Sequence, residues 1–470
     1  MKKRAYLTSL AAIVLIAAAR ADAGIISTVA IRNFQLFHPG FMNRSENPFD
    51  LSRPLSLLDA KEKIVRFSAV SEDVYRLEKD GVLRANVNAR GRKAFALLFT
   101  DGNEKNRAAL GFDRSDSKID FHSSQGVEAT DLGFDSAGSA VSIARRLGDF
   151  RFGAYRNASS ISGGGVSREM TDKLNLLGPG ARLSLSLKEE RQGWAVGVAL
   201  AEKYVVSYQA NHFRAPAAAT IEDAADVYSF PAEDTGSSYE VAAAVTGAKL
   251  RKAAVYYRRG GGTGYDDTRY HVSSPADPPL FQNRLRNAFK SYGAGFVRAV
   301  SKRSTLTLEI EKYNGSFSGA GIVEALNTLS GLYGNYYNYH HYGSLNFTRY
   351  DAHYVREGGR WGFAAAYMLM PFDADLYFDG CDKILGQCTK SLVVRNYRFR
   401  GSKLHALSLG VRLKLGRGKT LSYAVSQLVP QVEREAEAPP AAPPPAPPSP
   451  PEEKKETGGR THLVSLEFHF

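Results

Sequence analysis

The chain has 470 residues, of which 43% are hydrophobic, with 24 Tyr, 25 Phe, 43 Gly and only 2 Cys, and its formal net charge is +13. So few cysteines exclude a small scaffold held together by disulfide bonds, and after residue 24 no apolar run approaches the roughly 20 residues that a transmembrane helix needs. Because the basic residues form no long basic helix or nucleic-acid-binding motif, no nucleic-acid partner is predicted.

The first 23 residues have the three parts of a secretory signal peptide. Cations at positions 2–4 precede the apolar run of residues 10–19, and the small-residue motif Ala21-Asp22-Ala23 follows it. The apolar run is too short to span a bilayer as a helix. We therefore predict that residues 1–23 are a signal peptide and that the chain is exported by the Sec pathway of a Gram-negative-type envelope.

Residues 24–62 show no regular period. The dipeptides Asn47-Pro48 and Arg53-Pro54 break any regular element, and residues 56–62 fit one short helical turn. An Asn-Pro dipeptide in this position resembles the N-terminal hatch of barrels of the fatty-acid-transporter type, which implies a luminal plug. A periplasmic extension, or a first strand or two, is the alternative, and the sequence leaves both open.

From residue 63 the sequence repeats one unit of strand, tight turn, strand and long polar loop. Seven hairpins are predicted, with turns at residues 102–105, 148–149, 190–193, 246–247, 301–304, 358–359 and 416–418. Their paired strands are 93–100 with 107–114, 139–147 with 150–157, 182–188 with 194–204, 239–245 with 252–259, 292–300 with 305–313, 344–356 with 361–372, and 403–415 with 420–429. Short periplasmic turns that alternate with long extracellular loops are typical of a transmembrane barrel.

An opening strand at 63–70 or 81–89 and a closing strand at the C-terminus raise the count to about sixteen. If the first hairpin belongs to the N-terminal segment, about fourteen strands remain. The predicted fold class is therefore all-β, a transmembrane antiparallel β-barrel of about 14–16 strands over residues 63–470. A barrel of this size encloses a channel or a plugged lumen.

Alternation within the predicted strands separates an apolar face from a polar one. In the strand 403–415, for example, Leu407, Leu409 and Val411 alternate with Ser408 and Gly410. In a transmembrane barrel the apolar row faces lipid and the polar row faces a wet interior. On this rule the predicted lumen-facing cations are Arg182, Lys188, Arg412 and Lys414.

The C-terminal stretch has the same period of two and stops on an aromatic residue. Its apolar row consists of Val464, Leu466, Phe468 and Phe470. This ending resembles the closing strand of bacterial outer-membrane β-barrel proteins, whose terminal Phe is read by the assembly machinery. The resemblance is to this porin-like class and to no specific family. It implies location in the outer membrane and the barrel assembly machinery as a partner.

Two stretches between the predicted strands have their own chemistry. Residues 433–459 contain a dense proline run that favours an extended, solvated segment, either a disordered spacer or a ligand for a partner, in an extracellular loop. Cys381 and Cys388 are predicted to form one disulfide in another loop, because exported chains meet an oxidising environment. No catalytic or metal-ligand spacing stands out, so no enzyme activity, metal or cofactor is predicted.

The function predicted from these features is a channel or transporter in the outer membrane for small solutes. Basic side chains in the lumen would favour anions, and a luminal plug would instead favour hydrophobic solutes. The basic residues on the outside could face lipopolysaccharide phosphates. The alternative is a non-conducting surface adhesin or scaffold that acts through its extracellular loops.

Overall fold

The computed structural model describes residues 51–59, 63–73, 85–103, 105–123, 128–166, 182–201, 203–222, 227–247, 250–270, 279–325, 335–384, 387–391, 395–416, 418–431 and 459–470. The predicted signal peptide and almost all of the Pro-rich stretch 433–459 lie outside these residues. Within them, no helix is long and apolar enough to cross a membrane.

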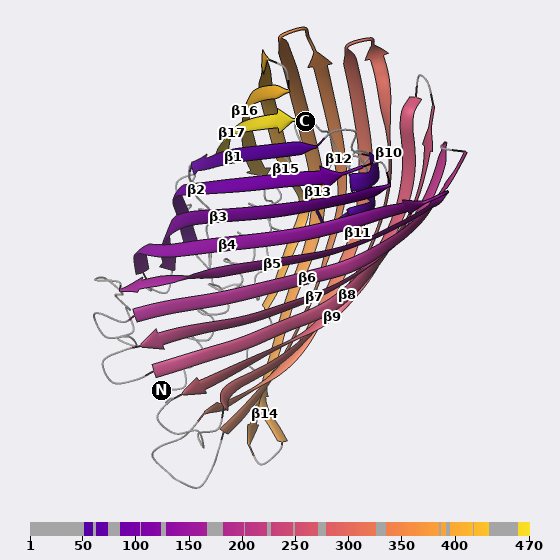
Figure 1. Cartoon of the computed structure of the whole chain (residues 1–470). Coiled ribbons are helices and arrows are strands. Elements are labelled where there is room, and N and C mark those ends of the chain that lie inside the picture. Colours follow the sequence, from indigo (N-terminus) through magenta and orange to yellow (C-terminus); the bar gives the residue numbers. More distant parts are fainter. Residues whose placement is uncertain are drawn as a thin grey trace, which may run out of the picture.

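The described chain is almost entirely antiparallel strand (Figure 1). One short 3-10 helix, η2 (Pro54–Asp59), comes first. The strands are β1 (Ile64–Asp73), β2 (Ala85–Gly102), β3 (Asn106–Ser123), β4 (Glu128–Leu147), β5 (Phe150–Val166), β6 (Arg182–Leu200), β7 (Tyr204–Glu222), β8 (Val227–Thr246), β9 (Leu250–Tyr270), β10 (Pro279–Ser301), β11 (Ser304–Ala325), β12 (Asn335–Glu357), β13 (Trp361–Ile384), β14 (Gln387–Ser391), β15 (Arg395–Gly416), β16 (Lys419–Gln431) and β17 (Gly459–His469).

The strands close into a barrel, which confirms the predicted fold class. Each strand pairs with the next in the chain, except that β13 pairs with β15 while the short β14 pairs with β13 only. The last strand β17 pairs with β1, from Ile64 opposite His469 to Asp73 opposite Arg460, and in Figure 1 the yellow β17 lies beside the indigo β1. Sixteen strands therefore form the closed wall. Closure satisfies the backbone hydrogen bonds that an open sheet edge would expose.

Seven tight turns connect strands at one end of the barrel, which we call the short-turn end. They include the β4–β5, β10–β11 and β15–β16 connections, and the seam between Lys63 and Phe470 lies at the same end. The connections at the other end are longer at several places, such as residues 167–181 and 432–458. The predicted asymmetry between the two ends of the barrel is therefore present, although the strands run much further than the alternation predicted.

The third predicted hairpin is wrong. Residues 190–193, expected to form its turn, lie inside β6, and the actual turn falls at residues 201–203, where Ala201 has a φ of 50°. The polar run at 189–192 looked like a turn because both of its faces are polar. In the structure Glu189 pairs with Arg191 on one face, and Glu190 pairs with Arg156 on the other. Polar pairs on both faces are compatible with a part of the strand that lies outside the membrane.

The two faces of the wall differ in the way expected of a barrel in lipid. Large apolar side chains stand exposed on the outer face over the half near the short-turn end, among them Phe67, Phe112, Ile143, Phe150, Trp194, Leu200, Val255, Trp361 and Leu407. Alternate residues of the same strands are small or polar and buried on the inner face. An exposed apolar band of this extent needs an apolar surrounding.

Beyond this apolar band, the outward side chains become polar. On β7 and β8, for example, Arg214 Nε donates a hydrogen bond to Glu233 Oε1 at 2.6 Å. This hydrogen bond lowers the pKa of the Glu233 carboxyl below its usual value. The parts of the strands furthest from the short-turn end therefore form a wall with water on its outer face.

Candidate functional site

Residues 51–59 lie against the inner face of the wall. η2 contacts β3, β4, β5 and β6, and Leu51 and Leu57 pack with Ala109 and Ala144. These two alanines alternate with the outward Leu110 and Ile143, so they point inward. The segment is thus seated inside the barrel, near its short-turn end.

Small inner-face residues form the cradle of this segment. A Cβ built on Gly153 would lie 2.6 Å from Pro54 Cβ, and one on Gly197 would lie 3.2 Å from Leu55 Cδ1. The Gln209 amide donates a hydrogen bond to the carbonyl oxygen of Ser52 at 2.7 Å. Because Gly153 and Gly197 have no side chains, the segment lies close to the strand backbones. The hydrogen bond from Gln209 then fixes its position on the wall.

Replacing Gly153 by valine is therefore expected to displace the segment. The new side chain would occupy the place of the Pro54 ring, whereas valine at Gly359, where an added Cβ meets nothing within 4 Å, serves as the control. The check is the rate at which a maleimide labels a cysteine placed at Ser56, which is buried, after Cys381 and Cys388 are changed to serine. Equal labelling rates in the two valine variants would contradict the seating described above.

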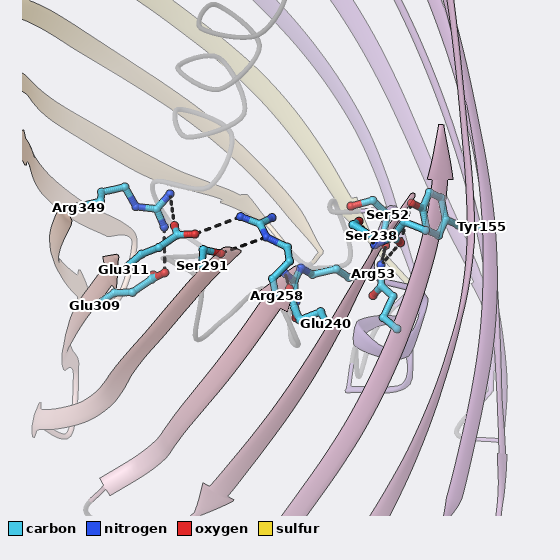
Figure 2. Close-up of polar contacts among 12 residues, drawn as sticks. Ser52, Arg53, Tyr155, Ser238, Glu240, Arg258, Ser291, Glu309, Glu311 and Arg349 are labelled. Atoms are coloured by element: carbon cyan, nitrogen blue, oxygen red, sulfur yellow. Dashed lines mark hydrogen bonds and ion pairs between the residues drawn. The ribbon is translucent and has the colours of Figure 1, made fainter. Parts of the chain in front are cut away.

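An ion pair joins the segment to the neighbouring part of the wall, on β8 (Figure 2). The Arg53 guanidinium donates two hydrogen bonds to the Glu240 carboxylate on β8, at 2.7 and 2.6 Å. The Glu240 side chain is only 7% exposed. Two parallel hydrogen bonds between guanidinium and carboxylate are the strong, directional form of this pair. With η2 on β3–β6 and Arg53 on β8, the segment extends across the inner face from β3 to β8.

A second set of charged residues lies on the inner face of β11 and β12. The Arg349 guanidinium lies 3.0 Å from Glu309, 3.1 Å from Glu311 and 2.7 Å from Asp351. The Glu309 and Glu311 side chains are 1% and 2% exposed. Charges this buried require such partners, because an isolated carboxylate away from water would cost several kcal/mol (about 3–5 when one partner is removed).

Arg258 lies between the two sets. Its guanidinium is 3.1 Å from Glu311 and its Nε donates to Ser291 Oγ at 3.3 Å. Figure 2 shows Arg258 between the Arg349 cluster and the Arg53–Glu240 pair. Charged side chains on β8, β9, β11 and β12 therefore form one band along this part of the inner wall, and the seated segment adds the cation Arg53 at its end.

An aromatic row lies next to this band, further from the short-turn end. Tyr313 on β11 stacks between Phe289 and Phe347, with ring centroids 5.7 and 4.7 Å apart. Phe289 also lies under the Arg258 guanidinium at 5.7 Å. Tyr313 and Phe347 share inward rows with Glu311 and Arg349, and Phe289 shares one with Ser291, so an apolar surface faces the lumen beside the charged band.

The structure places two of the predicted lumen cations on the inner face at the short-turn end. Arg412 Nη1 lies 2.9 Å from Glu357 Oε1, and Lys414 Nζ lies 3.8 Å from Glu357 Oε2. Nearby, Arg66 pairs with Glu467 at 3.3 Å. The two predicted cations therefore share one carboxylate, which offsets one of their two positive charges.

The other two predicted lumen cations, Arg182 and Lys188, do not face the lumen. They are exposed and belong to the outward row of β6 that contains Trp194 and Leu200. The alternating residues Leu185 and Leu187 are buried; Leu187 packs with Ala217 and Ala232. The correction has a physical reason: the prediction assumed lipid outside this stretch, but beyond the apolar band the outer face is polar and the apolar row turns inward.

The remaining predicted site residues are placed as follows. Val464, Leu466 and Phe468 form the outward row of β17, with Phe468 against Phe67, and Phe470 exchanges backbone hydrogen bonds with Lys63 across the seam. Cys381 pairs with Ser391 and Cys388 with Lys383 in the β13–β14 ladder, and their side chains lie outside the described set. The disulfide thus stays a prediction. Among the described residues, no group of His, Cys, Asp and Glu side chains could hold a metal ion.

The closed antiparallel wall, its exposed apolar band and its polar inner face define the class: a transmembrane β-barrel, as the outer-membrane resemblance implied. No family model and no curated protein matches the chain. Solved structures that resemble it include the Pseudomonas putida toluene transporter TodX (10% identity, TM-score 0.41, 89% of this chain and 92% of that one). Others are the monoaromatic hydrocarbon channel CymD (12%, 0.38, 90% and 91%) and the ferric citrate transporter FecA (7%, 0.39, 87% and 79%).

Proposed function

We propose that this chain is an outer-membrane channel or transporter for small solutes, whose lumen is narrowed by residues 51–59. The observation that carries the proposal is the Arg53–Glu240 pair, which fastens a short segment across the inner face of a sixteen-strand wall. A barrel of this size has more interior than its own inward side chains fill. If residues 51–59 leave their position on the inner face, the lumen widens, and the segment can control passage in this way.

The inner-face ion pairs described above add no net positive charge to the lumen. The cations of its ion pairs are Arg53, Arg66, Arg258, Arg349, Arg412 and Lys414, and the carboxylates are Glu240, Glu309, Glu311, Asp351, Glu357 and Glu467. Within these pairs the two sets are equal in number. The aromatic row of Phe289, Tyr313 and Phe347 adds an apolar surface. We therefore favour solutes with an apolar part over small anions.

The experiment that tests the proposal is single-channel recording of the refolded chain, without its first 23 residues, in a planar bilayer. Discrete conductance steps would support it. A barrel that folds, as judged by heat-modifiable migration on gels, yet never conducts even after residues 51–59 are replaced by a Gly-Ser stretch, would overturn it. The surface adhesin or scaffold would then be the remaining function.

Ion selectivity gives a separate prediction. Changing Arg412 and Lys414 together to glutamine is expected to shift the reversal potential in a KCl gradient toward cation preference, because it removes two positive charges and leaves the Glu357 carboxylate without them. The matched variant Glu357→Gln removes the carboxylate and is expected to shift the potential toward anion preference. Shifts of the same sign in the two variants, or no shift in either, would contradict a charged group of this kind beside the conducting path.

A further inference from the structure

The outer face of the barrel has an apolar hollow of about 860 Å³ that spans β7 to β13. Small side chains, Ala243, Ala253 and Ala294, belong to its lining, so the strand backbones are close to its surface. Larger apolar residues surround them, including Val255 and Phe296. All five are on outward rows, and the hollow therefore opens to the surroundings of the apolar band rather than to the lumen.

Three neighbouring strands carry the same order of side chains away from this hollow. Each outward row passes from hollow-lining residues through an apolar or aromatic residue to a cation: Val255, Tyr257 and Arg259 on β9; Ala294, Tyr292 and Lys290 on β10; and Leu308, Ile310 and Lys312 on β11. Successive residues of one row are about 7 Å apart along a strand. The three cations, which we call the basic cluster, thus lie just beyond the edge of the hollow.

The ladder brings the basic cluster together. Lys290 is directly opposite Arg259 on β9, and Lys312 on β11 is opposite Tyr292, one outward position from Lys290. Directly opposite side chains have Cβ atoms about 5 Å apart, and diagonal ones about 7–8 Å. Two more outward cations, Arg284 and Arg286, follow further along the row of β10. Like charges in direct opposition destabilise a sheet unless something compensates them.

The described part of the chain does not supply that compensation. None of the three cluster residues forms an ion pair among the described side chains. The only described carboxylate on the outward rows of β8 to β12 is Glu233, and Arg214 already binds it at 2.6 Å. Tyr257 and Tyr292 separate the cluster from the hollow, at the level where aromatic rings meet lipid headgroups.

We propose that the basic cluster and the hollow together bind one phosphorylated, multiply acylated lipid, the lipid A part of lipopolysaccharide. Its acyl chains occupy the hollow, and its phosphates accept charge-assisted hydrogen bonds from Arg259, Lys290 and Lys312. The inference rests on the outer-membrane location in the proposed function, with the short turns on the periplasmic side. The cluster then lies in the outer leaflet.

The test uses the refolded chain in detergent and purified lipid A, with bound lipid counted by native mass spectrometry and affinity measured by titration. The triple variant Arg259→Gln, Lys290→Gln, Lys312→Gln is expected to bind lipid A at least tenfold more weakly. The matched control, Arg114→Gln, Arg182→Gln, Lys188→Gln, removes three exposed outward cations elsewhere and is expected to bind like the unchanged chain. Equal losses in both variants would overturn a specific site.

Two further measurements distinguish binding of the whole lipid from binding of a simple anion. Filling the hollow with Ala294→Phe is expected to weaken the binding of lipid A but to leave the weak binding of inorganic phosphate unchanged. Displacement of lipid A by inorganic phosphate at equal concentration would overturn the lipid site. The readout is independent of conduction, so a barrel that binds lipid A but never conducts would remove the proposed channel and leave this inference standing. Heat-modifiable migration confirms that each variant is folded.

Discussion

Replacing Glu240 by glutamine is expected to raise the fraction of time that the channel is open. The substitution keeps the size of the side chain but removes the charge that Arg53 binds through two hydrogen bonds in a largely buried place. Hydrogen bonds between charged groups contribute about 1.5–3 kcal/mol each at such sites. Since about 1.4 kcal/mol corresponds to a factor of ten, we expect the ratio of open to closed time to rise at least tenfold. Single-channel recording measures this ratio directly.

A charge swap separates the loss of this pair from other effects of the substitution. The double variant Arg53→Glu, Glu240→Arg restores opposite charges at the two positions and is expected to return the open fraction toward that of the unchanged chain, while either single reversal should not. Arg156→Gln is the matched control, because it breaks an ion pair with Glu190 on the outer face. An open fraction that rises equally in Arg156→Gln and Glu240→Gln would show that the segment does not control passage.

Most of the wall follows from local patterns in the sequence. Alternation in the row of Leu407, Leu409 and Val411 places Arg412 on the inner face, as the structure does. Tight turns at residues 148–149 and 358–359 are visible because glycine and polar residues interrupt that alternation. These are local properties, since the period of two depends only on neighbouring residues of one strand.

The errors arose where the surroundings change along a strand. Arg182 and Lys188 alternate with leucines as cleanly as Arg412 does, yet they lie on the opposite face because this part of β6 lies beyond the apolar band, which the strand reaches only at Trp194. The same change of surroundings made residues 189–192 look like a turn. A period of two defines two faces but does not tell which of them meets lipid, water or the lumen.

The charged band was missed because its partners come from different strands. Glu309 and Glu311 are visible in the sequence as inward residues of one strand, but Arg349 lies on the next strand and Arg258 two strands away. One signal in the sequence could have helped: several charged residues recur on the polar rows of successive strands. Pairing them needs the register, which only the folded ladder provides.

Replacing Arg349 by methionine is expected to prevent or strongly weaken folding of the barrel. The variant leaves the carboxylates of Glu309, Glu311 and Asp351 side by side in a buried place, with only Glu311 still bound by Arg258. Removing one partner of a buried charge cluster costs about 3–5 kcal/mol. The measurement is the free energy of unfolding by urea in lipid vesicles, followed by tryptophan fluorescence and by heat-modifiable migration.

Compensating substitutions make this prediction sharp. The triple variant Arg349→Met, Glu309→Gln, Asp351→Asn removes both carboxylates that Arg349 alone balances and keeps the Arg258–Glu311 pair. It is expected to recover most of the lost stability, because buried ion pairs replaced as a group are often neutral in stability. Glu309→Gln and Asp351→Asn without the change at Arg349 serve as the control. If Arg349→Met is as stable as the unchanged chain, the four charges are hydrated and do not hold β11 to β12. The lumen would then be wide and wet at this level, and the seated segment would be the main barrier to passage.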